Sequence, residues 1–173
     1  MMTNKSQTYL IPFCVFIAVI PFIILQSYIR IPADAAWLTQ AAEHILNEQG
    51  LSEYYFDTNP PMSFWIYIPV ALLKILGLSS WNALQLYSVV LSALSIFGAS
   101  YFLKKLGASD TLHSLITLSY TFALFVLPAT EYGQKDHLIG IALLPFLLGQ
   151  LCITKDARIS KTVLIGTLFI CTP

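Results

Sequence analysis

Long apolar runs constrain this chain more than any other feature of its sequence. A helix needs about 20 apolar residues to cross the hydrocarbon core of a bilayer, and residues 9–29 contain no charged side chain. Further apolar runs cover residues 81–103, 112–128, 138–153 and 162–173. We therefore expect an all-α, polytopic membrane protein with about five transmembrane helices, the last of them truncated. Residues 1–173 would then form a single membrane domain.

The composition excludes several classes of function. The chain is 57% hydrophobic and 10% charged, with a mean hydropathy of +0.72 and a formal net charge of zero. Water-soluble domains do not have this composition. No basic patch with interleaved aromatic residues occurs, so nothing points to nucleic acid and we expect no such partner. The cysteines lie in or at the end of apolar runs and predict neither a disulfide framework nor a metal site; they are Cys14, Cys152 and Cys171.

The longest polar interval, residues 30–65, contains an amphipathic segment. Between residues 35 and 49, apolar and polar side chains recur with the 3.6-residue spacing of a helix, and Gly50 ends the pattern. The apolar set is Leu38, Ala41, Ala42, Ile45 and Leu46, and the polar set is Gln40, Glu43, Asn47 and Glu48. A helix of this kind fits the membrane surface better than the membrane interior, so we predict a juxtamembrane helix here.

Residues 62–77 are short for a transmembrane span and contain Pro69 and Lys74. Aromatic residues cluster at this boundary, as in the aromatic belts of membrane proteins; they are Tyr54, Tyr55, Phe56, Trp65 and Tyr67. If this segment does not cross, one group of basic residues faces the cytoplasm: Lys5, Lys104, Lys105, Lys155, Arg158 and Lys161. If it crosses, Lys104 and Lys105 lie outside. The positive-inside rule favours the arrangement in which the segment does not cross.

This topology places two acidic loops on the same side of the membrane. The N-terminus is then cytoplasmic, and residues 30–80 and 129–137 form outer loops of a multi-pass protein in the plasma (inner) membrane. A cleaved signal peptide is an alternative for residues 9–29, since Ala33-Asp34-Ala35 resembles a cleavage site. The apolar run is longer than an ordinary signal core, which favours a transmembrane helix.

Each outer loop carries candidate catalytic acids. Asp34 opens the first loop, although it could simply cap the helix that follows. The second loop contains Glu131, Lys135, Asp136 and His137 at the mouth between two apolar runs. Ionisable groups at a membrane boundary are usually paired, solvated or functional. The alternative for this loop is a solvated hinge between helices, and His137 is a candidate for orienting Asp136.

The layout and its short motifs resemble the N-terminal part of GT-C class integral-membrane glycosyltransferases. The resemblance rests on the initial apolar run, the segment ADAAW, the amphipathic helix, the segment NPPMSFW and the loop segment GQKDHL. The bacterial protein mannosyltransferase and aminoarabinose transferase types are the families to which it is similar. The resemblance extends over about residues 9–153.

This resemblance implies transfer of a sugar from a polyprenyl-phosphate donor to an acceptor on the outer face of the membrane. Asp34 would be the base that deprotonates the acceptor nucleophile. Asp136, with Glu131 as a nearby candidate, would help to hold the acceptor or the donor. An inverting transfer of this kind needs a base opposite the leaving group and a cation near the leaving phosphate.

The chain departs from the family pattern at the expected phosphate site. Many relatives carry a Lys directly before the Pro-Pro pair, whereas Asn59 precedes Pro60 here. Arg30 or Lys135 could supply the positive charge instead, and Asn59 and His137 belong to the same predicted substrate-binding set. Some relatives use a divalent cation and others do not, so the cofactor stays open.

The chain ends at Pro173 within an apolar run, so we expect it to be a fragment of a longer protein. The alternative function is a non-catalytic polytopic membrane protein, such as a transporter part, an assembly partner or an inactive remnant. A transporter would carry polar or charged residues near mid-span. Few polar residues occupy such positions, and this favours the enzyme; they are Ser92, Ser95, Ser119 and Thr121.

Overall fold

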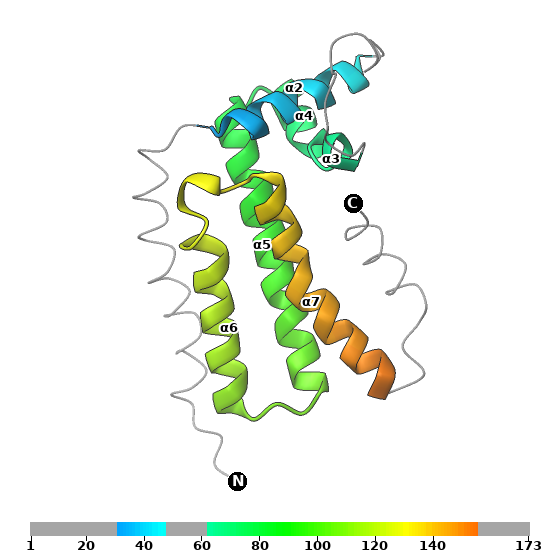
Figure 1. Cartoon of the computed structure of the whole chain (residues 1–173), viewed down its shortest axis with the longest axis vertical. Coiled ribbons are helices and arrows are strands. Elements are labelled where there is room, and N and C mark those ends of the chain that lie inside the picture. The colour runs from blue at the N-terminus through cyan, green and yellow to red at the C-terminus, as the bar shows by residue number, and fades with distance from the viewer. Residues whose placement is uncertain (1–30, 48–61, 156–173) are drawn as a thin grey trace.

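A computed structural model of the chain describes residues 31–47 and 62–155 (Figure 1). These residues are mostly helical and contain no strand, which confirms the predicted all-α class for this part of the chain. The helices are α2 (Ala33–Leu46), α3 (Met62–Trp65), α4 (Ile68–Ile75), α5 (Ser80–Lys105), α6 (Asp110–Phe125) and α7 (Lys135–Lys155), with a 3₁₀ turn η1 (Ala129–Glu131).

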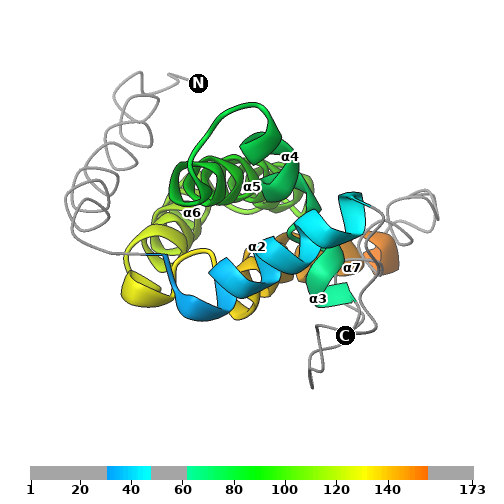
Figure 2. The ribbon, with the colours of Figure 1, turned by 90° about the horizontal axis from the view of Figure 1, so that it is seen from above.

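The described helices form a bundle and a cap. Helices α5, α6 and α7 run side by side with alternating direction, and α5 packs against both of the others (Figure 1). Helices α2, α3 and α4, here called the cap, gather at the end of the bundle where α5 begins (Figures 1 and 2). The connection between α6 and α7, residues 126–134, lies at that same end and is called the α6–α7 loop. The turn between α5 and α6 lies at the opposite end (Figure 1).

Two of the described helices, α5 and α7, are long and apolar enough to cross a membrane by length and composition. The predicted run 112–128 forms a shorter helix, because α6 has 16 residues and ends at Phe125. Pro128 accounts for this early end, since proline lacks a backbone N–H and disfavours helical geometry at the residue before it. The predicted spans at residues 9–29 and 162–173 lie outside the described residues.

Helix α5 exposes a row of large apolar side chains, and most of the residues that it buries are small. The exposed row consists of Leu86, Val90, Leu94, Phe97 and Tyr101. The buried row includes Ser88, Ser92, Ser95 and Ala99, at the spacing of successive helical turns. A soluble helix does the reverse, because water drives large apolar side chains into the core. Small residues at helix contacts are typical of helices that pack against one another in lipid, where they allow close approach.

A proline in α7 explains the strongest polar contact inside the bundle. Pro145 has no N–H to donate to the carbonyl of Ile141, four residues earlier. Two hydroxyl groups from other helices take its place. Tyr120 of α6 donates to the Ile141 oxygen at 2.6 Å, and Ser95 of α5 also donates to it. Since Gly98 of α5 lies opposite Pro145, the two helices approach closely at this level. One carbonyl therefore joins all three helices of the bundle.

The amphipathic pattern of the first loop identifies the correct face of α2 but not its partner. Leu38, Ala41 and Ala42 are fully buried, as the spacing predicted. They face α3 and α4, and the rings of Trp37 and Phe64 lie 5.8 Å apart between α2 and α3. The face that we expected on the membrane surface is therefore covered by protein.

Residues 62–77 form two short helices and not a span. Helix α4 has 8 residues, with Pro69 in its first turn, and Gly77 ends the segment with a φ of 97°. Ser79 then caps α5 by accepting a hydrogen bond from the backbone N–H of Asn82 at 3.2 Å. Lys74, whose charge made a span unfavourable, pairs with Glu43 of α2. The segment therefore packs within the cap.

We expect the two hydroxyls at the Ile141 carbonyl to be mutually redundant. Ser95→Ala or Tyr120→Phe alone should lower the free energy of unfolding by about 0.5–1 kcal/mol, since one donor remains. The double substitution leaves the carbonyl unsatisfied and should cost about 2 kcal/mol or more. Equilibrium unfolding in detergent micelles measures both.

Pro145→Ala provides the matched background, because it restores the missing N–H to α7. In that background the Ser95→Ala/Tyr120→Phe pair should cost distinctly less than it does with Pro145 present. An equal cost in both backgrounds would contradict this explanation of the contact.

Candidate functional site

Asp34 lies in the first turn of α2 and does not cap it. The helix begins at Ala33, and Pro32 occupies the N-cap position without a side-chain hydrogen bond. The predicted start at Ala35 was therefore two residues late, and the capping alternative for Asp34 was wrong. The Asp34 side chain is exposed at the N-terminal end of the helix, where the helix dipole favours a negative charge.

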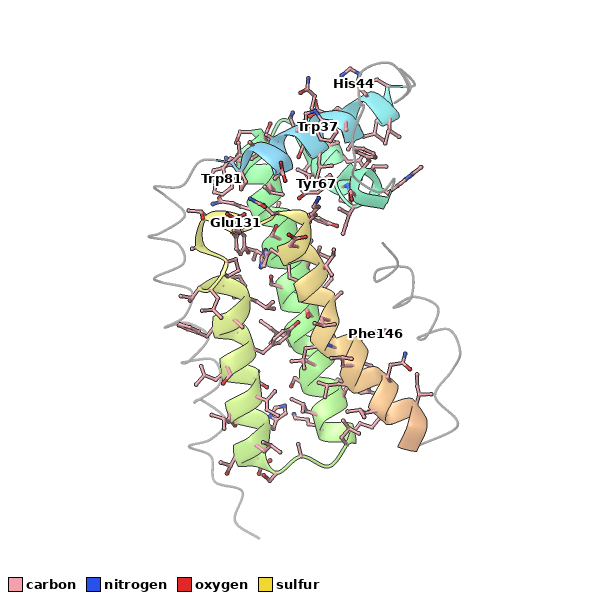
Figure 3. The ribbon with its side chains drawn as sticks, viewed as in Figure 1. Trp37, His44, Tyr67, Trp81, Glu131 and Phe146 are labelled. Carbon is pink, nitrogen blue, oxygen red and sulfur yellow. The ribbon has the colours of Figure 1, made fainter. Side chains whose placement is uncertain are left out.

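Asp136 occupies the equivalent position in α7. The α6–α7 loop passes through η1 and Gly133, and α7 begins at Lys135, which places Asp136 in its first turn. Its side chain is exposed, as is that of Glu131 on η1, while Lys135 is half-buried. Figure 3 shows Glu131 at the cap end of the bundle. The solvated-hinge alternative agrees with the exposure of the two acids. It does not account for the contacts that tie the loop to the cap.

Tyr67 lies at the junction between the cap, which carries Asp34, and the α6–α7 loop, which leads into Asp136. This side chain, in the link between α3 and α4, is fully buried where the cap meets the bundle (Figure 3). Burial raises the pKa of Tyr67 above its ordinary value, and Tyr87, Asp34 and Asp136 raise it further in that order. Asp34 lies in the first turn of α2, on the cap, and Asp136 lies in the first turn of α7, at the end of the bundle next to the cap.

The hydroxyl of Tyr67 also joins the cap to the α6–α7 loop. It donates a hydrogen bond of 2.8 Å to the carbonyl oxygen of Gly133. Because Tyr67 belongs to the cap and Gly133 to the loop, this bond holds together two segments that are 66 residues apart in the sequence. A buried tyrosine with a raised pKa keeps its proton, so it remains a donor.

His137 fixes the same loop from the other side. Its Nδ1 accepts a hydrogen bond from the Gly133 N–H at 3.0 Å, so its Nε2 carries the proton and donates to the Leu124 carbonyl at 2.9 Å. Pro128, four residues after Leu124, offers no N–H to that carbonyl. Both ring nitrogens bond to the backbone and not to Asp136. His137 therefore does not orient Asp136 through a hydrogen bond, and its role in substrate binding stays a prediction.

Aromatic packing encloses this histidine. The Tyr132 ring lies 4.6 Å from the His137 ring and stacks on Phe125, with 6.4 Å between the latter two centroids. Tyr132 is fully buried, and burial raises the pKa of its hydroxyl. The loop therefore has a buried inner side, formed by Tyr132 and Gly133, and an exposed outer side that carries Glu131.

A second polar contact lies between α2 and α4. Glu43 and Lys74 form an ion pair at a shallow hollow lined also by Asn47, Ala71 and Ile75. Both charged side chains are about a quarter to a third exposed, at 29% and 28%. Such pairs contribute little stability on average. The contact aligns α2 on α4 but lies more than two helical turns from Asp34 along α2.

The remaining predicted site residues are only partly placed. Arg30 and Asn59 lie outside the described residues. Glu131 and Lys135 share the α6–α7 end of the bundle with Asp136. Among residues 31–47 and 62–155, no three His, Cys, Asp or Glu side chains are grouped so that they could hold a metal ion.

Comparison of the chain with protein-family models, with curated proteins and with solved structures finds no match.

Tyr67 and Gly133 were not among the predicted site residues. We predicted Tyr67 as a residue of an aromatic belt, because nothing local to it indicates a partner 66 residues away. Gly133 carried a usable signal. It lies in the short polar connection between two apolar runs, where a glycine often adopts positive φ in a turn. Its φ is 83°.

Gly133→Ala should destabilise the protein more than Gly107→Ala does. Both glycines have positive φ, 83° and 81°, so both substitutions should carry a backbone cost of about 1 kcal/mol. A Cβ at Gly133 would also lie 2.8 Å from Cγ of Leu84, whereas nothing lies within 4 Å at Gly107. We expect a further cost of about 1–3 kcal/mol at Gly133.

Thermal unfolding in detergent measures the difference between these two variants. In the Gly133→Ala protein, Leu84→Ala should lower the melting temperature less than it does in the wild type. The reason is that it also removes the overlap between the new Cβ at position 133 and the Leu84 side chain. Equal melting temperatures for Gly133→Ala and Gly107→Ala would show that the loop does not pack against α5 as described.

Proposed function

We propose that the protein is an integral-membrane glycosyltransferase, or the N-terminal part of one. It would move a sugar from a polyprenyl-phosphate donor to an acceptor on the outer face of the membrane. The observation that supports this most is the placement of Asp34 on the cap and of Asp136 at the start of α7, in segments that the Tyr67–Gly133 hydrogen bond joins. Two exposed carboxylates from distant segments, each in the first turn of a helix, provide a base and a binding group on one side of the bundle.

In the proposed reaction, Asp34 takes the proton from the acceptor nucleophile as that atom attacks the anomeric carbon of the sugar. A bond forms between the acceptor and the anomeric carbon. The bond from that carbon to the phosphate oxygen breaks, and the polyprenyl phosphate leaves with the electron pair. Asp136 holds the acceptor or the sugar by hydrogen bonds. Lys135 is the described cation nearest in sequence to Asp136, and it would stabilise charge on the leaving phosphate.

The proposed topology is multi-pass, with about five spans in the plasma (inner) membrane and a cytoplasmic N-terminus. Lys104 and Lys105 end α5 at the pole opposite the cap, whereas Asp34, Glu131 and Asp136 lie at the cap. The positive-inside rule then assigns the cap to the outer face. A polyprenyl-phosphate donor is anchored in the bilayer, so its phosphate would lie at the level of the cap.

The non-catalytic alternative has less support from the described helices. Transporters carry ionisable groups inside the bundle, at the depth where the substrate crosses. In α5, α6 and α7 the Asp and Lys residues all belong to the terminal turns. The cap end, in contrast, concentrates acids at a single location, which suits chemistry at the membrane surface.

Asp34→Asn should abolish sugar transfer and leave membrane insertion unchanged. Loss of a general base typically lowers the rate by about 10²–10⁴-fold. Membranes containing the full-length protein are assayed with radiolabelled undecaprenyl-phosphate mannose and undecaprenyl-phosphate aminoarabinose as donors. Asp136→Asn should lower transfer as well.

Asp110→Asn is the matched control, because Asp110 also lies in the first turn of a helix and is exposed, but at the opposite pole. It should retain wild-type activity. Full activity of Asp34→Asn would remove Asp34 as the base. Absence of transfer from both donors by the wild-type protein would contradict the proposed function for these donors.

A further inference from the structure

The peptide of Gly133 is held on both sides by side chains from different parts of the fold. Its carbonyl accepts from Tyr67 of the cap at 2.8 Å, and its N–H donates to His137 of α7 at 3.0 Å. His137 is in turn bonded to the end of α6 through the Leu124 carbonyl. One peptide therefore connects the cap, α6 and α7.

The hydrogen bond from Tyr67 ties this peptide to the cap. The His137 and Leu124 bonds fix Gly133 to the bundle, but they do not involve α2, α3 or α4. The cap, for its part, packs on the first turns of α5 through α4. The Tyr67 hydroxyl bridges from the cap to the loop directly. Asp136 follows Gly133 by three residues, and Asp34 lies on the cap.

Tyr67 cannot itself touch a substrate in this arrangement. Its side chain is fully buried, and its proton is directed at the Gly133 oxygen. Burial keeps it protonated, so it remains a donor over the range in which enzymes work. Its influence on any reaction at the surface must pass through the position of the loop.

We propose that Tyr67 is a positioning residue that sets the spacing between Asp34 and Asp136 through its hydrogen bond to Gly133. This inference deepens the proposed function and rests on it for its effect on sugar transfer. Its geometric part, the coupling of the cap to the α6–α7 loop, stands apart from any activity. Small misplacements of catalytic groups cost about 10²-fold in rate. The loss of one hydroxyl at this junction should therefore be visible in kinetics.

Tyr67→Phe tests the proposal, because it removes the hydroxyl and keeps the buried ring. Spin labels at Gln40→Cys on α2 and Thr130→Cys on η1, both exposed positions, report the distance between cap and loop. Cys14, Cys152 and Cys171 are replaced by alanine in this background. Double electron–electron resonance should give a narrow distribution of label-to-label distances for the parent protein and a broader one for Tyr67→Phe. Tyr101→Phe is the control, because it makes the same chemical change at an exposed site near the C-terminal end of α5, far from the cap. The distance distribution should stay narrow in this variant.

Kinetics with the undecaprenyl-phosphate donors provide the second measurement. Tyr67→Phe should lower kcat by about 10- to 100-fold with little change in the KM for the donor, since the base is misplaced while binding persists. A distribution as narrow as the parent's would overturn the proposal, whatever the activity. A broad distribution with unchanged kcat would overturn the positioning role in the reaction. A broad distribution in a protein without any transferase activity would support the coupling and contradict only the proposed function.

Discussion

Backbone carbonyls that lose their helical partner to a proline hold this structure together. Pro145 deprives the Ile141 carbonyl of its N–H, and Ser95 and Tyr120 replace it. Pro128 does the same to Leu124, whose carbonyl accepts from His137. In an apolar surrounding, an unsatisfied backbone group costs several kcal/mol. Since each replacement donor belongs to another element, the bonds that remove this cost also determine where the helices lie. The prolines therefore leave carbonyls without a helical donor, and side chains from other helices donate to them instead.

The candidate site follows from the second of these contacts. His137 donates from Nε2 to the Leu124 carbonyl and accepts from the Gly133 N–H at Nδ1. The Gly133 carbonyl is directed at the cap. Tyr67 donates to that carbonyl, and this bond ties the cap, which carries Asp34, to the loop that leads into Asp136. A buried, fully bonded framework thus supports two exposed acids. Rigid support of this kind is what a catalytic constellation on loops requires.

Much of the architecture could be predicted from local patterns, whereas the contacts between segments could not. Hydrophobic spacing located the buried face of α2. The short length of residues 62–77, with Pro69 and Lys74, made a span doubtful, and the segment forms two short helices. The covering of α2 by α3 and α4 was not predicted, because amphipathicity reveals a face but not its partner. The start of α2 was missed by two residues, since Pro32 can act as an N-cap without a side-chain bond. Tyr67 was missed because its partner is a backbone atom, and a carbonyl carries no sequence signature.

The central claim is that Asp34 and Asp136 lie close together on one side of the membrane. In a cysteine-free background, Asp34→Cys and Asp136→Cys can be joined by a short, membrane-impermeant bifunctional maleimide added to intact cells. The predicted result is a crosslink, recognised because the two fragments still migrate together on a gel after proteolysis between the two sites. Labelling of both cysteines without a crosslink, or labelling of one of them only after the membrane is opened, would contradict the account.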